Sequence, residues 1–269
     1  MDLGLSGRKA LVTGASAGIG ESIALKFVEA GVEVALLARD RGRLSAAADR
    51  IESATGRRPH IVAADVTIPE QIKSAAAEAR NLLGQIDILV NNAGNGVYKP
   101  FLEVTEEELV SGMEINFFAM FRMCREVIPM LIAQGGGSIL NITGISGSSA
   151  MAPPFYNSCT GPAKAAENRL TKTLAAEFGP HNIRVNAVSP GRLNAPERLE
   201  RWRDKIDGGK GAAMSVRDMQ RLWGRQISLP DHRWGEVDEI ANLAVFAASE
   251  ACGFMTGAVL VADGGESHD

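Results

Sequence analysis

Short apolar segments alternate with helical patterns along nearly the whole chain, and this order constrains the fold more than any other feature. A strand followed by a helix joins its next strand by a right-handed crossover, which places both strands parallel in one sheet. Within these segments apolar residues follow one another with few polar residues between them, as in strands of a sheet that is covered on both faces. The sequence therefore predicts an α/β fold with a doubly wound parallel sheet. We expect seven strands, at residues 9–14, 33–38, 60–66, 86–94, 137–144, 183–191 and 257–265.

Residues 192–230 interrupt this rhythm with a long insertion that carries several arginines and tryptophans. Long insertions after the carboxyl end of a strand often close over a ligand, so we expect a lid there. No linker or internal repeat divides the chain, and residues 1–269 are expected to form one domain. The expected helices cover residues 18–30, 41–54, 70–83, 106–133, 163–178 and 236–248.

The composition argues against several classes of protein. A formal net charge of −4 gives no reason to expect nucleic acid or an anionic membrane as a partner. No apolar run reaches the roughly 18 residues of a membrane span. The three cysteines have no metal-ligand spacing, so neither a metal site nor a disulfide framework is expected, and Cys124 and Cys252 are expected to be buried. The first residues lack the basic and apolar regions of a signal peptide, which predicts a cytoplasmic protein.

The segment TGASAGIG, residues 13–20, follows the first expected strand and opens the first expected helix. Gly14, Gly18 and Gly20 allow a tight turn and a close approach of the backbone to a pyrophosphate. The amide groups and the dipole of the helix N-terminus then favour the negative charge. This context predicts a dinucleotide site.

Other motifs stand at the carboxyl ends of later strands, where such sheets bind ligands. They are Asp65 with Val66, the NNAG segment at 91–94, and the SPG segment at 189–191. Lys164 lies in the expected helix that follows the fifth strand. One glycine motif is weak evidence by itself, but these motifs together strongly favour a dinucleotide site.

Taken together, these segments resemble the short-chain dehydrogenase/reductase family over essentially the full length. The resemblance rests on the glycine loop, NNAG, Asn116, Lys164 with the residues after it, IRVNAVSPG and TGAVLVADGG. It implies a Rossmann-like sheet, a nicotinamide cofactor, a small-molecule substrate and a homo-oligomer, a tetramer or dimer built through helices 106–133 and 163–178. Apolar residues of the first helix fit such an interface or a plain core equally: Met113, Phe117, Met120, Phe121 and Cys124. The cofactor-binding residues expected are Gly14, Ser16, Gly18, Ile19, Gly20, Arg39, Asp65, Val66, Asn92, Ala93, Gly94, Lys164, Pro190 and Gly191.

The end of the second strand indicates which cofactor is preferred. An acid there would bind the ribose hydroxyls of NAD and repel a 2′-phosphate, whereas this chain has Ala38 followed by Arg39. Arginine pairs well with phosphate, so NADP(H) is predicted. The alternative is that Arg39 is only a solvated loop charge. Ala195 replaces a threonine that in the family holds the nicotinamide carboxamide.

The catalytic pattern of the family is only half present. Asn116 and Lys164 match, but Gly144 stands at the place of the serine and Thr160 at that of the tyrosine. Tyr156 is the proposed replacement acid, and the alternative is a surface tyrosine. An aliphatic hydroxyl is far less acidic than a phenol, so Thr160 is expected mainly to cap the following helix, ahead of Gly161 and a proline. In this respect the chain is similar to 2,4-dienoyl-CoA reductases, which keep the lysine and recruit an upstream tyrosine.

The sequence therefore predicts an NADP(H)-dependent oxidoreductase that reduces a C=O or a conjugated C=C bond with a rearranged acid. The catalytic candidates are Asn116, Tyr156, Thr160 and Lys164. A cofactor-binding sensor or scaffold without turnover remains the alternative. A non-redox lyase step has no specific support in the residues.

Overall fold

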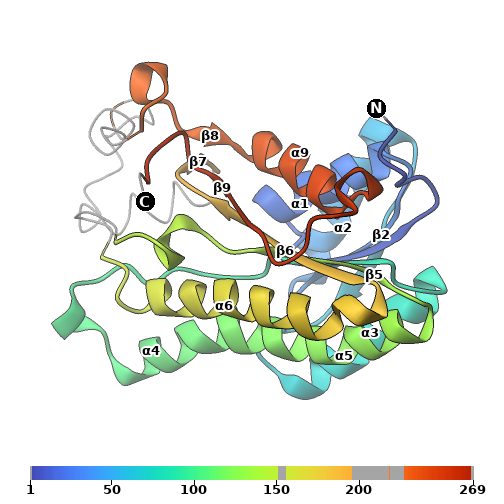
Figure 1. Ribbon diagram of the computed structural model, residues 1–269, viewed down its shortest axis with the longest axis horizontal. Coiled ribbons are helices and arrows are strands. Elements are labelled where there is room, and N and C mark those ends of the chain that lie inside the picture. Colours follow the sequence, from blue (N-terminus) through green and yellow to red (C-terminus); the bar gives the residue numbers. More distant parts are fainter. Residues whose placement is uncertain (1, 151–155, 196–217, 219–226, 268–269) are drawn as a thin grey trace.

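A seven-stranded parallel sheet forms the centre of the molecule, as the sequence predicted (Figure 1). The computed structural model describes residues 2–150, 156–195, 218 and 227–267. The strand order is β3-β2-β1-β4-β5-β6-β9, and two further short strands, β7 and β8, pair with each other. The strands are β1 (Lys9–Thr13), β2 (Glu33–Ala38), β3 (His60–Ala63), β4 (Ile88–Asn91), β5 (Gly137–Ile142), β6 (Ile183–Pro190), β7 (Leu193–Asn194), β8 (Gly235–Glu236) and β9 (Val259–Ala262).

Helices cover both faces of this sheet. One apolar core lies between the sheet and α1, α2 and α9, and a second lies between the sheet and α3, α5 and α6 (Figure 1). Each core draws on alternate residues of the same strands, which explains why the strands read as nearly continuous apolar runs. The helices are α1 (Gly18–Glu29), α2 (Arg41–Thr55), α3 (Pro69–Leu83), α4 (Glu106–Met113), α5 (Ala119–Ala133), α6 (Thr160–Phe178) and α9 (Val237–Ala248).

The sheet reverses its direction of growth between β1 and β4. From β1 the chain adds β2 and then β3 on one side, and afterwards it returns to place β4, β5, β6 and β9 on the other. Connections therefore leave the carboxyl ends of β1 and β4 in opposite directions. Such a switch point opens a crevice between the two strand ends, and this is where open α/β sheets bind their ligands.

The helix expected over residues 106–133 is interrupted. Thr105 and Glu108 form a capping box at the start of α4, and a π-helical turn (Glu114–Phe118) separates α4 from α5. Turns of this kind are frequent at functional sites because they shift the register of the side chains that follow. Asn116 lies inside the π turn and is 1% exposed.

The apolar residues of this segment divide between the core and the surface. Met120 and Cys124 belong to the buried core, whereas Phe121 is 43% exposed. Burial raises the pKa of the Cys124 thiol to about 12, so this thiol is unreactive at neutral pH. The prediction that Cys124 and Cys252 are buried is confirmed.

Among the residues that the structure describes, no helix is both long and apolar enough to cross a membrane. The expected lid at 192–230 lies mainly outside the described residues. Its described parts are residues 192–195, Asp218 and residues 227–230.

Candidate functional site

Two adjoining pockets lie at the switch point of the sheet, and both are lined by Ile19, Asn92, Gly94 and Asn95. The pocket that includes Gly14, Gly18 and Arg39 is called the glycine-loop pocket, and the pocket that includes Lys164 is called the lysine pocket. Of the predicted cofactor residues, the glycine-loop pocket is lined by Gly14, Ser16, Gly18, Ile19, Arg39, Val66, Asn92, Ala93 and Gly94. The lysine pocket adds Lys164, Pro190 and Gly191, while Gly20 and Asp65 line neither.

The glycine loop has the geometry that its sequence predicted. Gly14 and Gly18 adopt φ values of +64° and +58°, which side chains with a Cβ rarely tolerate. Gly20 has no room for a Cβ, which would lie 2.4 Å from both the Gly14 carbonyl oxygen and the Asn92 amide nitrogen. The residue before α1 is Ala17, and no side chain caps the helix. The first amides of α1 therefore remain available to an anionic ligand beside the glycine-loop pocket.

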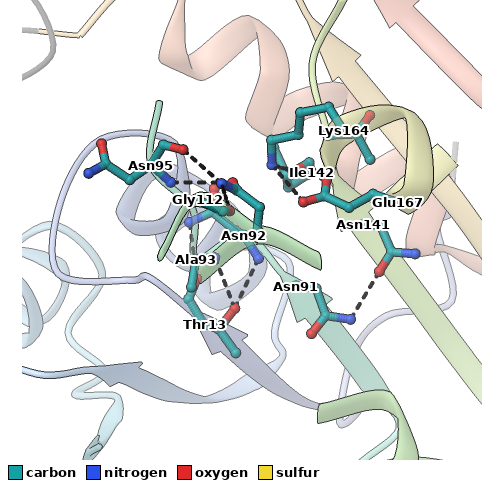
Figure 2. A network of polar contacts seen from close by, with 12 residues as sticks. Thr13, Asn91, Asn92, Ala93, Asn95, Gly112, Asn141, Ile142, Lys164 and Glu167 are labelled. Carbon is teal, nitrogen blue, oxygen red and sulfur yellow. Dashed lines mark hydrogen bonds and ion pairs between the residues drawn. The ribbon is translucent and has the colours of Figure 1, made fainter. Parts of the chain in front are cut away.

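Hydrogen bonds join the glycine loop to the NNAG segment (Figure 2). Thr13 Oγ1 accepts hydrogen bonds from the backbone amides of Asn92 and Ala93, at 2.9 and 3.1 Å. The Asn92 side chain donates to the carbonyl oxygens of Thr13 and Gly14, at 3.0 and 3.1 Å. The ends of β1 and β4 are thereby held together, although 79 residues separate Thr13 from Asn92 in the sequence.

Arg39 borders the glycine-loop pocket and keeps most of its side chain, 73%, in solvent. Its guanidinium lies 3.7 Å from Asp65, which also accepts hydrogen bonds from the backbone and the hydroxyl of Thr67. Burial disfavours the charge on Asp65, but the Thr67 hydrogen bonds and Arg39 outweigh it and lower the pKa of this carboxyl. Arg43 lines the same pocket from the first turn of α2. Sequence reasoning missed Arg43, although the run RDRGR contained it.

Lys164 lines the lysine pocket and is engaged in a buried ion pair (Figure 2). Its ammonium group lies 3.0 Å from each carboxylate oxygen of Glu167, one helical turn further along α6. Lys164 is 9% exposed and Glu167 is 2% exposed. Burial raises the pKa of Glu167, and the adjacent Lys164 opposes this rise. Glu167 was not among the predicted site residues, although an acid three residues after Lys164 was a usable signal.

Thr160 does not cap α6, so that expectation was wrong. It is the first residue of α6, and the capping position belongs to Cys159. The Thr160 hydroxyl accepts a hydrogen bond from the Val97 amide at 2.8 Å and donates to the Val97 carbonyl at 3.2 Å. The residue thus ties the loop after β4 to the start of α6 at the edge of the lysine pocket.

Replacing Thr160 by valine should therefore destabilise the protein through this loop. Valine keeps the shape but leaves the Val97 amide without its partner, which costs about 1–3 kcal/mol. Thr173→Val is a matched control, because Thr173 lies on the same helix, is exposed, and donates its hydrogen bond to the Arg169 carbonyl of its own helix. Urea unfolding of both variants measures the difference. Equal losses in the two variants would contradict the role assigned to Thr160.

The backbone at Gly144, where the family has a serine, adopts a conformation that favours glycine. Gly144 has φ +153°, a conformation that residues with a Cβ rarely adopt, so a serine there would be strained. Thr143 and Ser146, the neighbouring hydroxyl residues, both line the lysine pocket. Hydroxyl groups are thus present beside Lys164, but not at the position that the motif indicated.

The two tyrosines of the chain lie in different surroundings from each other. Tyr156 is 41% exposed and is not among the described residues that line the lysine pocket. Tyr98, half-buried on the loop after β4, does line it. Sequence reasoning did not select Tyr98, although its position four residues after NNAG was a usable signal.

Asn116 lines neither pocket, but its hydrogen bonds hold a residue that lines both. Its side-chain amide donates to the carbonyl oxygens of Asn95 and Gly112, both at 2.8 Å. Its oxygen accepts a hydrogen bond from the Asn95 backbone at 3.3 Å. The π turn thereby fixes the loop that borders both pockets.

Arg192 is a second buried charge on the lysine pocket and was not among the predicted site residues. It is 5% exposed, and its Nε donates to Glu266 at 2.7 Å. Burial raises the pKa of Glu266, and Arg192 opposes the rise. The pocket therefore combines two buried ion pairs with several hydroxyl groups.

Comparison with known proteins gives matches along nearly the whole chain. The family described as enoyl-(acyl carrier protein) reductase matches residues 14–267. A peroxisomal 2,4-dienoyl-CoA reductase from Danio rerio is 34% identical over 261 residues, 97% of this chain and 82% of that protein. L-xylulose reductase from Mus musculus is 35% identical over 266 residues, 98% of each chain. L-sorbose reductase from Gluconobacter frateurii, solved with NADPH and L-sorbose, is 33% identical, with a TM-score of 0.90 over 100% of both chains. On these matches, together with the sheet and its two pockets, the chain belongs to the short-chain dehydrogenase/reductase family.

Proposed function

We propose that this protein is an NADP(H)-dependent oxidoreductase of short-chain type that reduces a C=O or a conjugated C=C bond of a small or acyl-type substrate. One observation carries the proposal: Lys164 lies in a pocket that adjoins the glycine-loop pocket and shares four of its lining residues. A nucleotide held by the glycine loop can thus reach the lysine, the hydroxyl groups and a substrate in the second pocket.

The residues of the glycine-loop pocket fit a dinucleotide phosphate. The uncapped N-terminus of α1 and the close packing at Gly14 and Gly20 leave backbone amides beside the pocket, with no side chain in the way. Arg39 and Arg43, on the same pocket, would face a 2′-phosphate. The L-sorbose reductase neighbour was solved with NADPH, which supports the same coenzyme here.

NADPH should bind at least about tenfold more tightly than NADH, a difference of about 1.4 kcal/mol. Arg39→Ala should remove most of this preference and leave NADH binding nearly unchanged, because Arg39 would contact only the 2′-phosphate. Calorimetry with both coenzymes at low and high salt measures the effect, which should weaken with salt because Arg39 is exposed. Arg41→Ala, two residues further along the chain at a position that does not line the pocket, is the control. Equal affinities for the two coenzymes in the wild type would remove the proposal of NADP(H).

When bound, the coenzyme supplies the hydride, and the protein must stabilise the negative charge that develops on the substrate oxygen. The Lys164 ammonium and the hydroxyl groups of Ser146 and Tyr98 lie on the same pocket and can donate hydrogen bonds to that oxygen. Tyr156, the acid that the sequence suggested, would have to reach the pocket from an exposed position. The proton source is therefore one of two phenols or Lys164 itself.

The relatives suggest which substrates to test. Their names include a dienoyl thioester reductase and reductases of the sugars L-xylulose and L-sorbose. A screen of enoyl and dienoyl thioesters, enones and ketoses against NADPH oxidation tests the proposed reaction. Consumption of NADPH with one class of substrate supports it and identifies the bond that is reduced.

A coenzyme-binding sensor or scaffold is the second candidate function. It is favoured by the Thr160 hydroxyl, which is bonded to Val97, and by Lys164, whose charge is paired with Glu167. Tight NADPH binding without turnover across the whole screen would favour this second function.

A homo-oligomer, a tetramer or a dimer, is part of the same proposal. Phe118 and Phe121 are exposed at the junction of the π turn and α5, where a second copy of the chain could cover them. Sedimentation velocity gives the number of chains.

A further inference from the structure

The ion pair between Lys164 and Glu167 lies on the boundary between the lysine pocket and the interior. Lys164 faces the pocket, whereas Glu167 lines a small cavity beneath it, together with Met120 and Met123 of α5 and Ile142 at the end of β5. Both carboxylate oxygens of Glu167 point at the lysine nitrogen (Figure 2). The carboxylate thus holds the ammonium from the side that faces away from solvent.

Among the residues that the structure describes, Glu167 has no charged neighbour other than Lys164. Thr13 and Asn91, at the ends of β1 and β4, are the polar residues among those that line its cavity, and both are neutral. Within the described residues, Lys164 is the charged group that acts on Glu167. On the other side of Lys164, the pocket presents Tyr98 and Arg192, and Arg192 is paired with Glu266.

The Lys164 nitrogen also lies 3.5 Å from the Ile142 carbonyl oxygen, at the end of β5. We propose that Glu167 is a positioning residue that keeps Lys164 in its ammonium form and holds that ammonium at the wall of the pocket, within reach of the bound coenzyme. Lys164 as a whole residue is 9% exposed, and an ammonium group on so buried a residue is costly without a counter-charge. Glu167 supplies that charge from within α6 itself and leaves the side of Lys164 that faces the pocket open. The inference rests on the proposed binding of NADP(H), since the readout is coenzyme affinity.

The test measures NADPH affinity by calorimetry from about pH 6.5 to about pH 9 for the wild type, Glu167→Gln and Glu167→Asp. Glutamine keeps the shape but removes the counter-charge of the buried ammonium, which disfavours the charged form of that group. Between about pH 6.5 and about pH 9, the NADPH affinity of Glu167→Gln should therefore fall by a factor about ten times larger than the factor by which the wild-type affinity falls. Glu167→Asp, which retains the charge, should restore the wild-type dependence on pH. Glu177→Gln, exposed on the same helix, should not differ from the wild type.

A Glu167→Gln profile parallel to the wild type, in a folded protein, would overturn the inference and leave the proposed function intact. Absence of NADPH binding by the wild type would instead remove the proposed function. If Glu167→Gln does not fold, the wild-type protein can be tested instead. Calorimetry in buffers of different ionisation enthalpy then measures how many protons the wild type takes up when it binds NADPH. No proton uptake between about pH 8 and about pH 9 supports a lysine already charged, whereas uptake that grows with pH overturns the proposal.

Discussion

Lys164→Ala should lower the free energy of unfolding by about 3–5 kcal/mol and abolish measurable turnover. The loss of stability follows from the structure, because Glu167 would keep a buried carboxylate without its partner at 2% exposure. Coenzyme affinity should fall as well, since the ammonium lies on the pocket that adjoins the glycine loop. Urea unfolding and calorimetry with NADPH measure the two effects separately.

The double variant Lys164→Met with Glu167→Leu separates stability from chemistry. Apolar side chains of similar volume remove both buried charges, so most of the stability should return, while turnover stays lost. Glu177→Gln on the exposed side of α6 again serves as the control. A single variant Lys164→Ala as stable as the wild type would mean that Glu167 is not held as a charged partner.

Tyr98→Phe should lower kcat by about 100-fold or more if the phenol on the lysine pocket donates to the substrate oxygen. The substitution removes one hydroxyl group and keeps the ring, so coenzyme affinity should change little. Steady-state kinetics on whichever substrate the screen identifies measures the effect, with NADPH binding as the check on folding.

Tyr156→Phe is the matched comparison, because Tyr156 is the other tyrosine of the chain and the acid that the sequence suggested. A large loss in Tyr98→Phe with none in Tyr156→Phe would assign the acid to the loop after β4. The opposite pattern would assign it to Tyr156, which would then have to approach the pocket when substrate binds. Full activity in both variants would leave Lys164 as the proton source.

The fold could be predicted from the sequence because its signals are local. Each strand and helix is defined by a run of neighbouring residues, and the glycine loop needs only its own backbone and the helix that it opens. The predicted seven strands correspond to the seven strands of the main sheet, and each predicted helix is present, with the helix at 106–133 divided by a π turn. Within that turn, Asn116 bonds back to Gly112 and across to Asn95, and hydrophobic periodicity does not reveal contacts of this kind.

The catalytic side of the site was harder to predict, because its contacts join segments far apart in the chain. The Thr160 hydroxyl bonds Val97 across 63 residues, and Tyr98 lines the lysine pocket from the same loop. A motif aligned along the chain identifies the position of Thr160 but not the backbone group that its hydroxyl meets. The sequence alone therefore determined the sheet, the nucleotide loop and Lys164. Only the tertiary structure decided which tyrosine lines the pocket of that lysine, because this depends on how the loop after β4 packs against α6. It also showed that the Lys164–Glu167 pair is buried, because burial depends on the elements packed against α6.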